Sequence, residues 1–132
     1  MANEAVFLEI NENCNAKQMT VAAGTSISKG TLLKLSGDNT VSASAADSDV
    51  YGGVAAADKD GTDSSTTLAV YVPNQQNKFD MKCGAAVTLG NLVSLSDANM
   101  IKPATEAEVV TGDVIGKAME AGDVAEVIVV LS

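Results

Sequence analysis

Short segments that alternate apolar and polar residues are the strongest pattern in this chain, and they predict β-strands. Residues 31–37 and 91–97 both show this alternation, which is typical of a half-buried strand. Each segment ends in residues that tolerate turn geometry, GDN at 37–39 and DAN at 97–99, and a short apolar return follows. Each therefore predicts a β-hairpin.

The two hairpins belong to a longer internal similarity. Residues 24–41 align without gaps against residues 84–101, and the matched positions include Gly24/Gly84, Gly30/Gly90, Leu32/Leu92, Leu35/Leu95 and Asn39/Asn99. With small shifts the similarity continues, pairing YGGVAAAD at 51–58 with VIGKAMEA at 114–121 and TTLAVYV at 66–72 with AEVIVVL at 125–131. The chain is therefore predicted to contain two related units, 19–73 and 79–132, joined by the polar sequence PNQQN.

Helix is scarce in the predicted fold. The best candidate is 103–110, with Pro103 in the first turn and acidic residues near the start, whereas 42–50 is predicted to be a loop. The valine-rich strand near the C-terminus is apolar on both faces, which favours a central position in a sheet. The fold class is predicted as all-β with at most one short helix, the two tandem units packing as a small sandwich or barrel.

Residues 1–18 lie outside the internal similarity and are predicted to form an extended N-terminal arm, separate from one compact domain at 19–132. AVFLEI at 5–10 is the most apolar part of this arm. Two fates are open to such a strand: it caps an edge of its own sheet, or it adds as a strand to another chain.

Composition removes several function classes. The 132 residues carry 17 acidic and 8 basic side chains, a formal net charge of −9, and such a surface repels nucleic acid. All the cations are lysines, and histidine, arginine and tryptophan are absent. We therefore predict no enzymatic activity, no catalytic residues and no cofactor. Lys117, the one lysine in a small apolar setting, is interpreted as a lysine stem at a sheet edge.

Metal and disulfide chemistry also find little support. Asp58, Asp60 and Asp63 resemble the start of a calcium loop, but the later positions lack the glycine and glutamate that an EF-hand needs. A solvated turn is favoured, with a weak divalent-cation site as the alternative and no metal site assigned. Cys14 and Cys83 could pair, although two half-buried thiols are the favoured interpretation in a reducing compartment.

The chain shows no signal-peptide pattern and no apolar run long enough to span a bilayer, so synthesis in the cytoplasm and no membrane partner are expected. Aromatic residues make up only 3% of the chain. A core of small side chains is modestly stable alone, and association would stabilise it.

The segments SISKGTLLKLSG, YGGVAAAD, AVTLGNLVSLSD, VIGKAMEA and VAEVIVVLS together resemble the head decoration, or capsid cement, proteins of tailed phages. The resemblance implies a non-enzymatic β-rich protein on the exterior of the virion, bound to the major capsid protein and reinforcing capsomer junctions. It also implies self-association, with a trimer favoured and a dimer or monomer possible. In such proteins an N-terminal arm commonly contacts the shell, which here gives Val6, Phe7, Leu8 and Ile10 as the expected capsid-binding residues.

The alternative function is a small cellular β-barrel module that binds a ligand. Such a module would need a pocket lined by aromatic and amide side chains. Only two tyrosines and two phenylalanines are present, which disfavours it.

Overall fold

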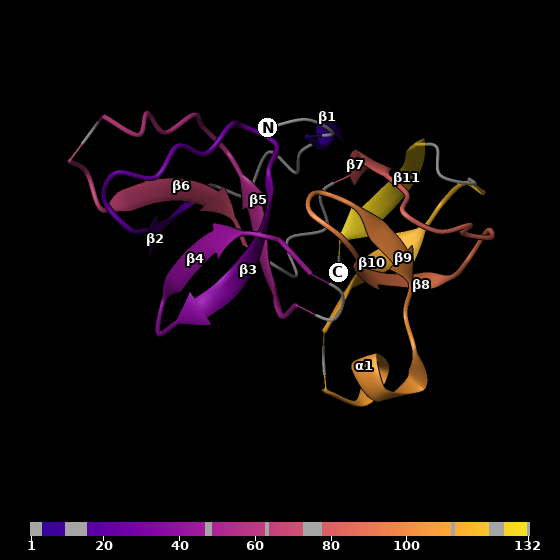
Figure 1. Cartoon of the computed structure of the whole chain (residues 1–132). Helices are drawn as coiled ribbons and strands as arrows, with labels where there is room; N and C mark the ends of the chain where they lie inside the picture. The colour runs from indigo at the N-terminus through magenta and orange to yellow at the C-terminus, as the bar shows by residue number, and fades with distance from the viewer. Residues whose placement is uncertain are drawn as a thin grey trace.

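The computed structural model describes residues 4–9, 16–46, 49–62, 64–72, 78–111, 113–121 and 126–131. Two β-rich units lie side by side, and a short helix lies at one edge of the second (Figure 1). The first unit consists of β2 (Lys17–Thr20), β3 (Leu32–Gly37), β4 (Thr40–Ala43), β5 (Tyr51–Ala55) and β6 (Thr67–Tyr71). The second consists of β7 (Lys78–Lys82), β8 (Leu92–Leu95), β9 (Ile101–Pro103), α1 (Glu106–Thr111), β10 (Val114–Ala118) and β11 (Glu126–Leu131). The N-terminal strand β1 (Val6–Glu9) precedes both.

The first unit is a closed barrel with the strand order β2-β4-β3-β5-β6. Neighbouring strands are antiparallel except at one point of closure, where β2 meets β4 in parallel through Thr20 and Thr40. Closure leaves this small sheet with no open edge.

The second unit has the same order of strands. Its sheet runs β1-β7-β11-β10-β8-β9, so β7, β9, β8, β10 and β11 take the places of β2, β4, β3, β5 and β6. An isolated parallel bridge between Cys83 and Ile101 joins the end of β7 to β9, as β2 joins β4 in the first unit. The added strand β1 is antiparallel to β7, with Phe7 opposite Phe79.

The fold class predicted from the sequence is confirmed: the chain is nearly all β, with one short helix. Both predicted hairpins are present, and the asparagines in their turns, Asn39 and Asn99, have the positive φ angles of 50° and 59° that asparagine tolerates better than most residues. The C-terminal strand β11 lies inside its sheet, between β7 and β10, as its apolar sequence predicted.

The helix begins later than the sequence pattern suggested. Pro103 is the last residue of β9, and α1 spans Glu106–Thr111. Thr105 is the N-cap, because its hydroxyl accepts a hydrogen bond from the Glu108 N–H at 3.3 Å. A side chain that caps the helix therefore decides where it starts, rather than the fixed φ of proline.

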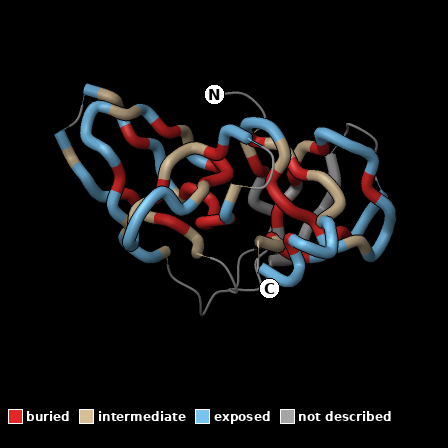
Figure 2. The backbone as a smooth tube through the Cα atoms, turned by 60° about the horizontal axis from the view of Figure 1, so that its bottom comes forward, coloured by how far each residue is buried: buried red, intermediate tan, exposed pale blue. Residues whose placement is uncertain are grey.

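Two apolar clusters stabilise the structure, and Figure 2 shows buried segments inside both units. One cluster fills the first barrel with the buried side chains of Val21, Ile27, Leu33, Val41, Ala55, Leu68 and Val70. The other is the core of the second unit, and it extends into the first unit through Leu32, Tyr51 and Val54. We call this extension the junction. It includes a tilted ring contact between Tyr71 and Phe79, with centroids 6.3 Å apart.

A single buried asparagine makes polar contacts across the junction. Asn99, fully buried in the β8–β9 turn, accepts a hydrogen bond from the Leu32 N–H at 2.7 Å with its side-chain oxygen. Its own backbone N–H donates to the Ser44 hydroxyl at 3.1 Å. Two buried backbone donors, one in each unit, are thus satisfied by contacts across the junction.

The replacement Asn99→Ala is expected to destabilise the protein by about 2–4 kcal/mol, because the buried Leu32 N–H loses its acceptor and alanine disfavours positive φ. The matched control is Asn39→Ala, which carries the same backbone strain at an exposed turn and should cost about 1–2 kcal/mol. Urea unfolding of both variants measures the difference. Equal losses would contradict the role assigned to the Asn99 side chain.

Candidate attachment surface

Three of the four residues expected to contact a capsid lie on the edge strand of one sheet. Val6, Phe7 and Leu8 belong to β1, the terminal strand of the second sheet, and Ile10 lies outside the described residues. One side of β1 pairs with β7, while the other is a sheet edge, where backbone groups can receive a further strand. Of the two fates predicted for this segment, the structure shows the first, and the second remains a prediction for the outer edge.

The N-terminal segment contacts both units. The Ala5 N–H donates to the Gly30 carbonyl of the first unit at 2.7 Å, and the next residues pair with β7 of the second. Gly30 has a φ of +90°, and an added Cβ would lie 2.5 Å from the Ala5 oxygen. A glycine is therefore required here both for its backbone angle and for the close approach of this segment.

The aspartates that resembled a calcium loop form a hydrogen-bonded turn. The Asp60 carboxylate accepts bonds from the Thr62 N–H at 2.9 Å and from its hydroxyl at 3.0 Å, and these bonds hold the Asp60 pKa below its usual value. Asp58 accepts from the Lys29 N–H at 2.6 Å, while Asp63 lies outside the described residues. Within the described ranges, no group of three or more acidic or cysteine side chains is placed to hold a metal ion.

The two cysteines and Lys117 were the other residues considered for chemical roles. Cys83 is buried in the core of the second unit, and Cys14 lies outside the described residues. Lys117 is exposed on β10, opposite Leu92 of β8. The predicted position at a sheet edge is wrong, because β10 lies between β11 and β8. No helix in the described part of the chain is long and apolar enough to cross a membrane.

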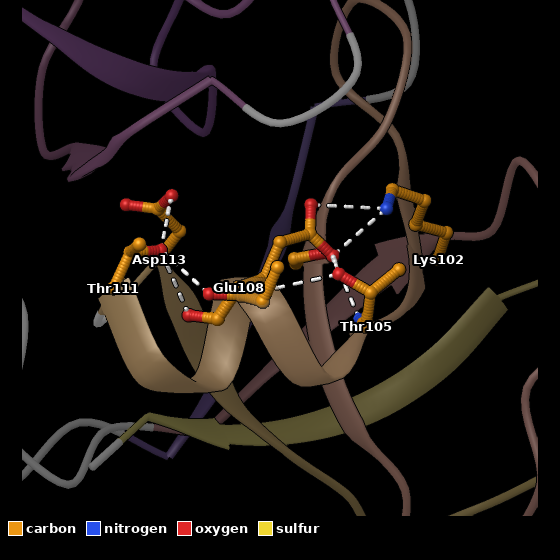
Figure 3. A network of polar contacts seen from close by, with 7 residues as sticks. Lys102, Thr105, Glu108, Thr111 and Asp113 are labelled. Carbon is orange, nitrogen blue, oxygen red and sulfur yellow. Dashed lines mark hydrogen bonds and ion pairs between the residues drawn. The ribbon is translucent and has the colours of Figure 1, made fainter.

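A buried ionic network fixes α1 to the sheet (Figure 3). The Glu108 carboxylate accepts bonds from the Lys102 ammonium of β9 at 2.9 and 3.0 Å and from the Ser94 hydroxyl of β8 at 3.0 Å. It also accepts the Thr105 N–H at 2.8 Å, which completes a capping box with the bond from the Glu108 N–H to Thr105. One carboxylate therefore both starts the helix and attaches it to two strands.

The C-terminal end of the helix also has hydrogen-bond partners, which Thr111 and Asp113 supply. The Thr111 hydroxyl donates to the Ala107 carbonyl at 3.0 Å and lies 2.9 Å from the Asp113 carboxylate. The Asp113 N–H donates to the Glu108 carbonyl at 2.9 Å. Both ends of this six-residue helix are thereby supplied with hydrogen-bond partners.

The helix forms one wall of an apolar groove of about 460 Å³, whose other wall is the start of β8. The groove is lined by Gly90, Asn91, Leu92, Ala104, Glu106, Val109 and Val110. Val109 and Val110, which both line the groove, are 46% and 86% exposed. Apolar side chains so exposed and so close together are typical of a surface that binds another protein.

Sequence reasoning missed this groove, although one signal was present. Thr105 and Glu108 have the spacing of a capping box, which would have placed the helix start at 106 and Val109–Val110 on a short exposed helix. No comparable local signal places α1 against β8.

The sequence matches no protein-family model, and it matches no curated protein. Among solved structures it is similar to the N-terminal base of the head fibre protein gp8.5 of bacteriophage phi29. The two chains are 20% identical, with a TM-score of 0.56, and the match covers 88% of this chain and 93% of the other. At this identity the similarity shows a shared fold, and it includes both β units because it covers nearly the whole chain.

Replacement of Glu108 by glutamine should destabilise the protein by about 3–5 kcal/mol, because Lys102 keeps a largely buried charge without its counterion. Glu106→Gln is the matched control on the same helix. Glu106 is exposed, so the control should lose only about 0.3–1 kcal/mol of helix-dipole stabilisation. Urea unfolding measures both values, and amide exchange at Val109, whose N–H bonds to Thr105, reports the helix directly. Equal effects in the two variants would show that the network does not hold the helix.

Proposed function

We propose that this protein is a structural, non-enzymatic component of a phage head that attaches to the outer surface of the assembled shell. The observation that carries the proposal is the fold shared with the base of a phage head fibre over nearly the full length of both chains. The sequence also resembles phage head decoration proteins in the glycine and valine patterns of its strands, which favours the same class of protein.

The physical character of the chain is compatible with this role. A shell offers many equivalent sites, so a lattice-bound protein gains strength from repeated contacts and no single interface has to be strong. The net charge of −9 would keep unbound copies soluble and away from nucleic acid. The proposal assigns no reaction and no cofactor to the protein.

The alternative, a small ligand-binding β-barrel, gains no support from the first unit. Seven buried apolar side chains fill the interior of that barrel, which leaves it a packed core of the kind found in small barrels. A structural role accounts better for a barrel with this interior.

Sedimentation with expanded, undecorated phage heads tests the proposal. The protein should pellet with the heads at micromolar concentration and saturate at a fixed number of copies per head. Bovine serum albumin, an acidic protein unrelated to phage, is the control and should stay in the supernatant. If this protein also stays there, attachment to the shell is wrong.

The predicted contact residues can be tested in the same assay. Phe7 and Leu8 are adjacent in β1, and each is replaced by alanine in turn. At least one of Phe7→Ala and Leu8→Ala should weaken head binding by about tenfold while the unfolding midpoint stays unchanged. If neither changes binding, the contact lies elsewhere on the protein.

A further inference from the structure

The groove on the second unit is the counterpart of a surface that is covered on the first unit. Leu32 and Leu92 occupy matching positions, yet Leu32 is fully buried and Leu92 is 39% exposed. Their neighbours Gly30 and Gly90 also match, with φ angles of +90° and +86°. An added Cβ at Gly30 would collide with Ala5, whereas at Gly90 it would meet nothing within 4 Å.

The first unit shows what kind of structure fits such a surface. Residues 4 and 5 cover its Gly30 end. The β8–β9 turn of the second unit covers its Leu32 end and places the Asn99 side chain on the Leu32 N–H. In the part of the chain that the structure describes, no side chain bonds to the Leu92 N–H in this way. The groove beside Leu92 is therefore open where its counterpart holds a turn carrying an asparagine.

We propose that a second copy of this chain docks on the second unit as the second unit docks on the first, with its β3–β4 turn in the groove. That turn carries Asn39, which matches Asn99 and has nearly the same φ. Asn39 is exposed at the tip of its hairpin. The chain thus carries the open groove on its second unit and, on its first unit, an exposed β3–β4 turn of the same type as the β8–β9 turn.

The groove differs from its counterpart in two ways. Ala104 matches Ser44 in the sequence, so the groove lacks the hydroxyl that accepts the Asn99 N–H in the first unit. An incoming Asn39 could therefore make only the other hydrogen bond, in which its side-chain oxygen accepts the Leu92 N–H. In exchange, α1 supplies Val109 and Val110, which are 46% and 86% exposed. Removal of these side chains from water would provide the main driving force.

The salt dependence of binding distinguishes a second copy of this chain from a basic partner. Asp38 in the incoming turn and Glu106 in the groove carry the same sign, and each copy has a net charge of −9. Added salt screens this repulsion, so self-association should strengthen with ionic strength. A basic partner would bind more weakly as salt is raised.

The proposed contact joins two different surfaces, so it is heterologous, and it closes into a ring or extends as a chain. This inference is independent of the proposed function, because it concerns copies of the chain in solution without a shell.

Sedimentation velocity of the full chain between about 1 and 300 μM tests the inference, a range that detects dissociation constants of weak interfaces. The wild type should form larger species at the upper concentrations, and more of them in about 0.5 M than in about 50 mM salt. Val109→Glu should weaken this association by about tenfold or more. The matched control is Val50→Glu, because Val50 is also 46% exposed but belongs neither to the groove nor to the β3–β4 turn, and it should associate like the wild type.

A mixing experiment identifies the two halves of the contact. Asn39→Gly keeps the positive φ but removes the inserting amide, so this variant has an intact groove and a defective turn. Val109→Glu has the opposite defect. Each variant alone should be largely monomeric, and an equimolar mixture should form dimers that do not extend further, through the one intact turn and groove.

Three results would overturn the inference. The first is a wild type that is monomeric at every concentration and salt, and the second is an equal loss of association in Val109→Glu and Val50→Glu. The third is self-association that weakens as salt is raised, which would show that attraction between opposite charges, and not the apolar groove, holds the copies together.

Discussion

The shared core at the junction is the contact on which the rest of the structure depends. Each unit is only about fifty residues, too small to bury much apolar surface alone, and the second unit's core is completed by Leu32, Tyr51 and Val54 of the first. Burial of Tyr51 at this junction costs some stability, because its hydroxyl is enclosed without a hydrogen-bond partner among the described residues. The same enclosure raises the Tyr51 pKa above its usual value.

Asn99 gives this apolar contact a defined geometry. Apolar packing is non-directional, whereas a buried amide oxygen facing the Leu32 N–H can be satisfied in few relative orientations of the two units. Among the described residues, the Asn39 side chain makes no contact of this kind within its own chain, and its backbone carbonyl accepts a bond from the Thr20 N–H within the first barrel. One turn type, used twice, therefore serves barrel closure in one unit and contact between units in the other.

Much of the fold could be predicted because its signals are local. The strand alternation, the asparagine turns and Gly30 and Gly90 each specify backbone geometry within a few residues. The difference between Leu32 and Leu92 could not be predicted, because the two residues have similar neighbours in the sequence and differ only in what packs against them. The same limit applies to β1, whose sequence allowed pairing within or between chains, and to the groove, which exists only once α1 is held against β8.

The pairing of β1 with β7 also determines the order in which the protein can be assembled during synthesis. Domains emerge from the ribosome N-terminal end first, so Phe7 leaves long before Phe79, the residue opposite it. The first barrel has all of its strands before the second unit has been made, and it can close while β1 still has no partner. Strand β1 thus precedes the first barrel in the chain but finds its partner only after that barrel can close, and until then its backbone edge is open to other chains.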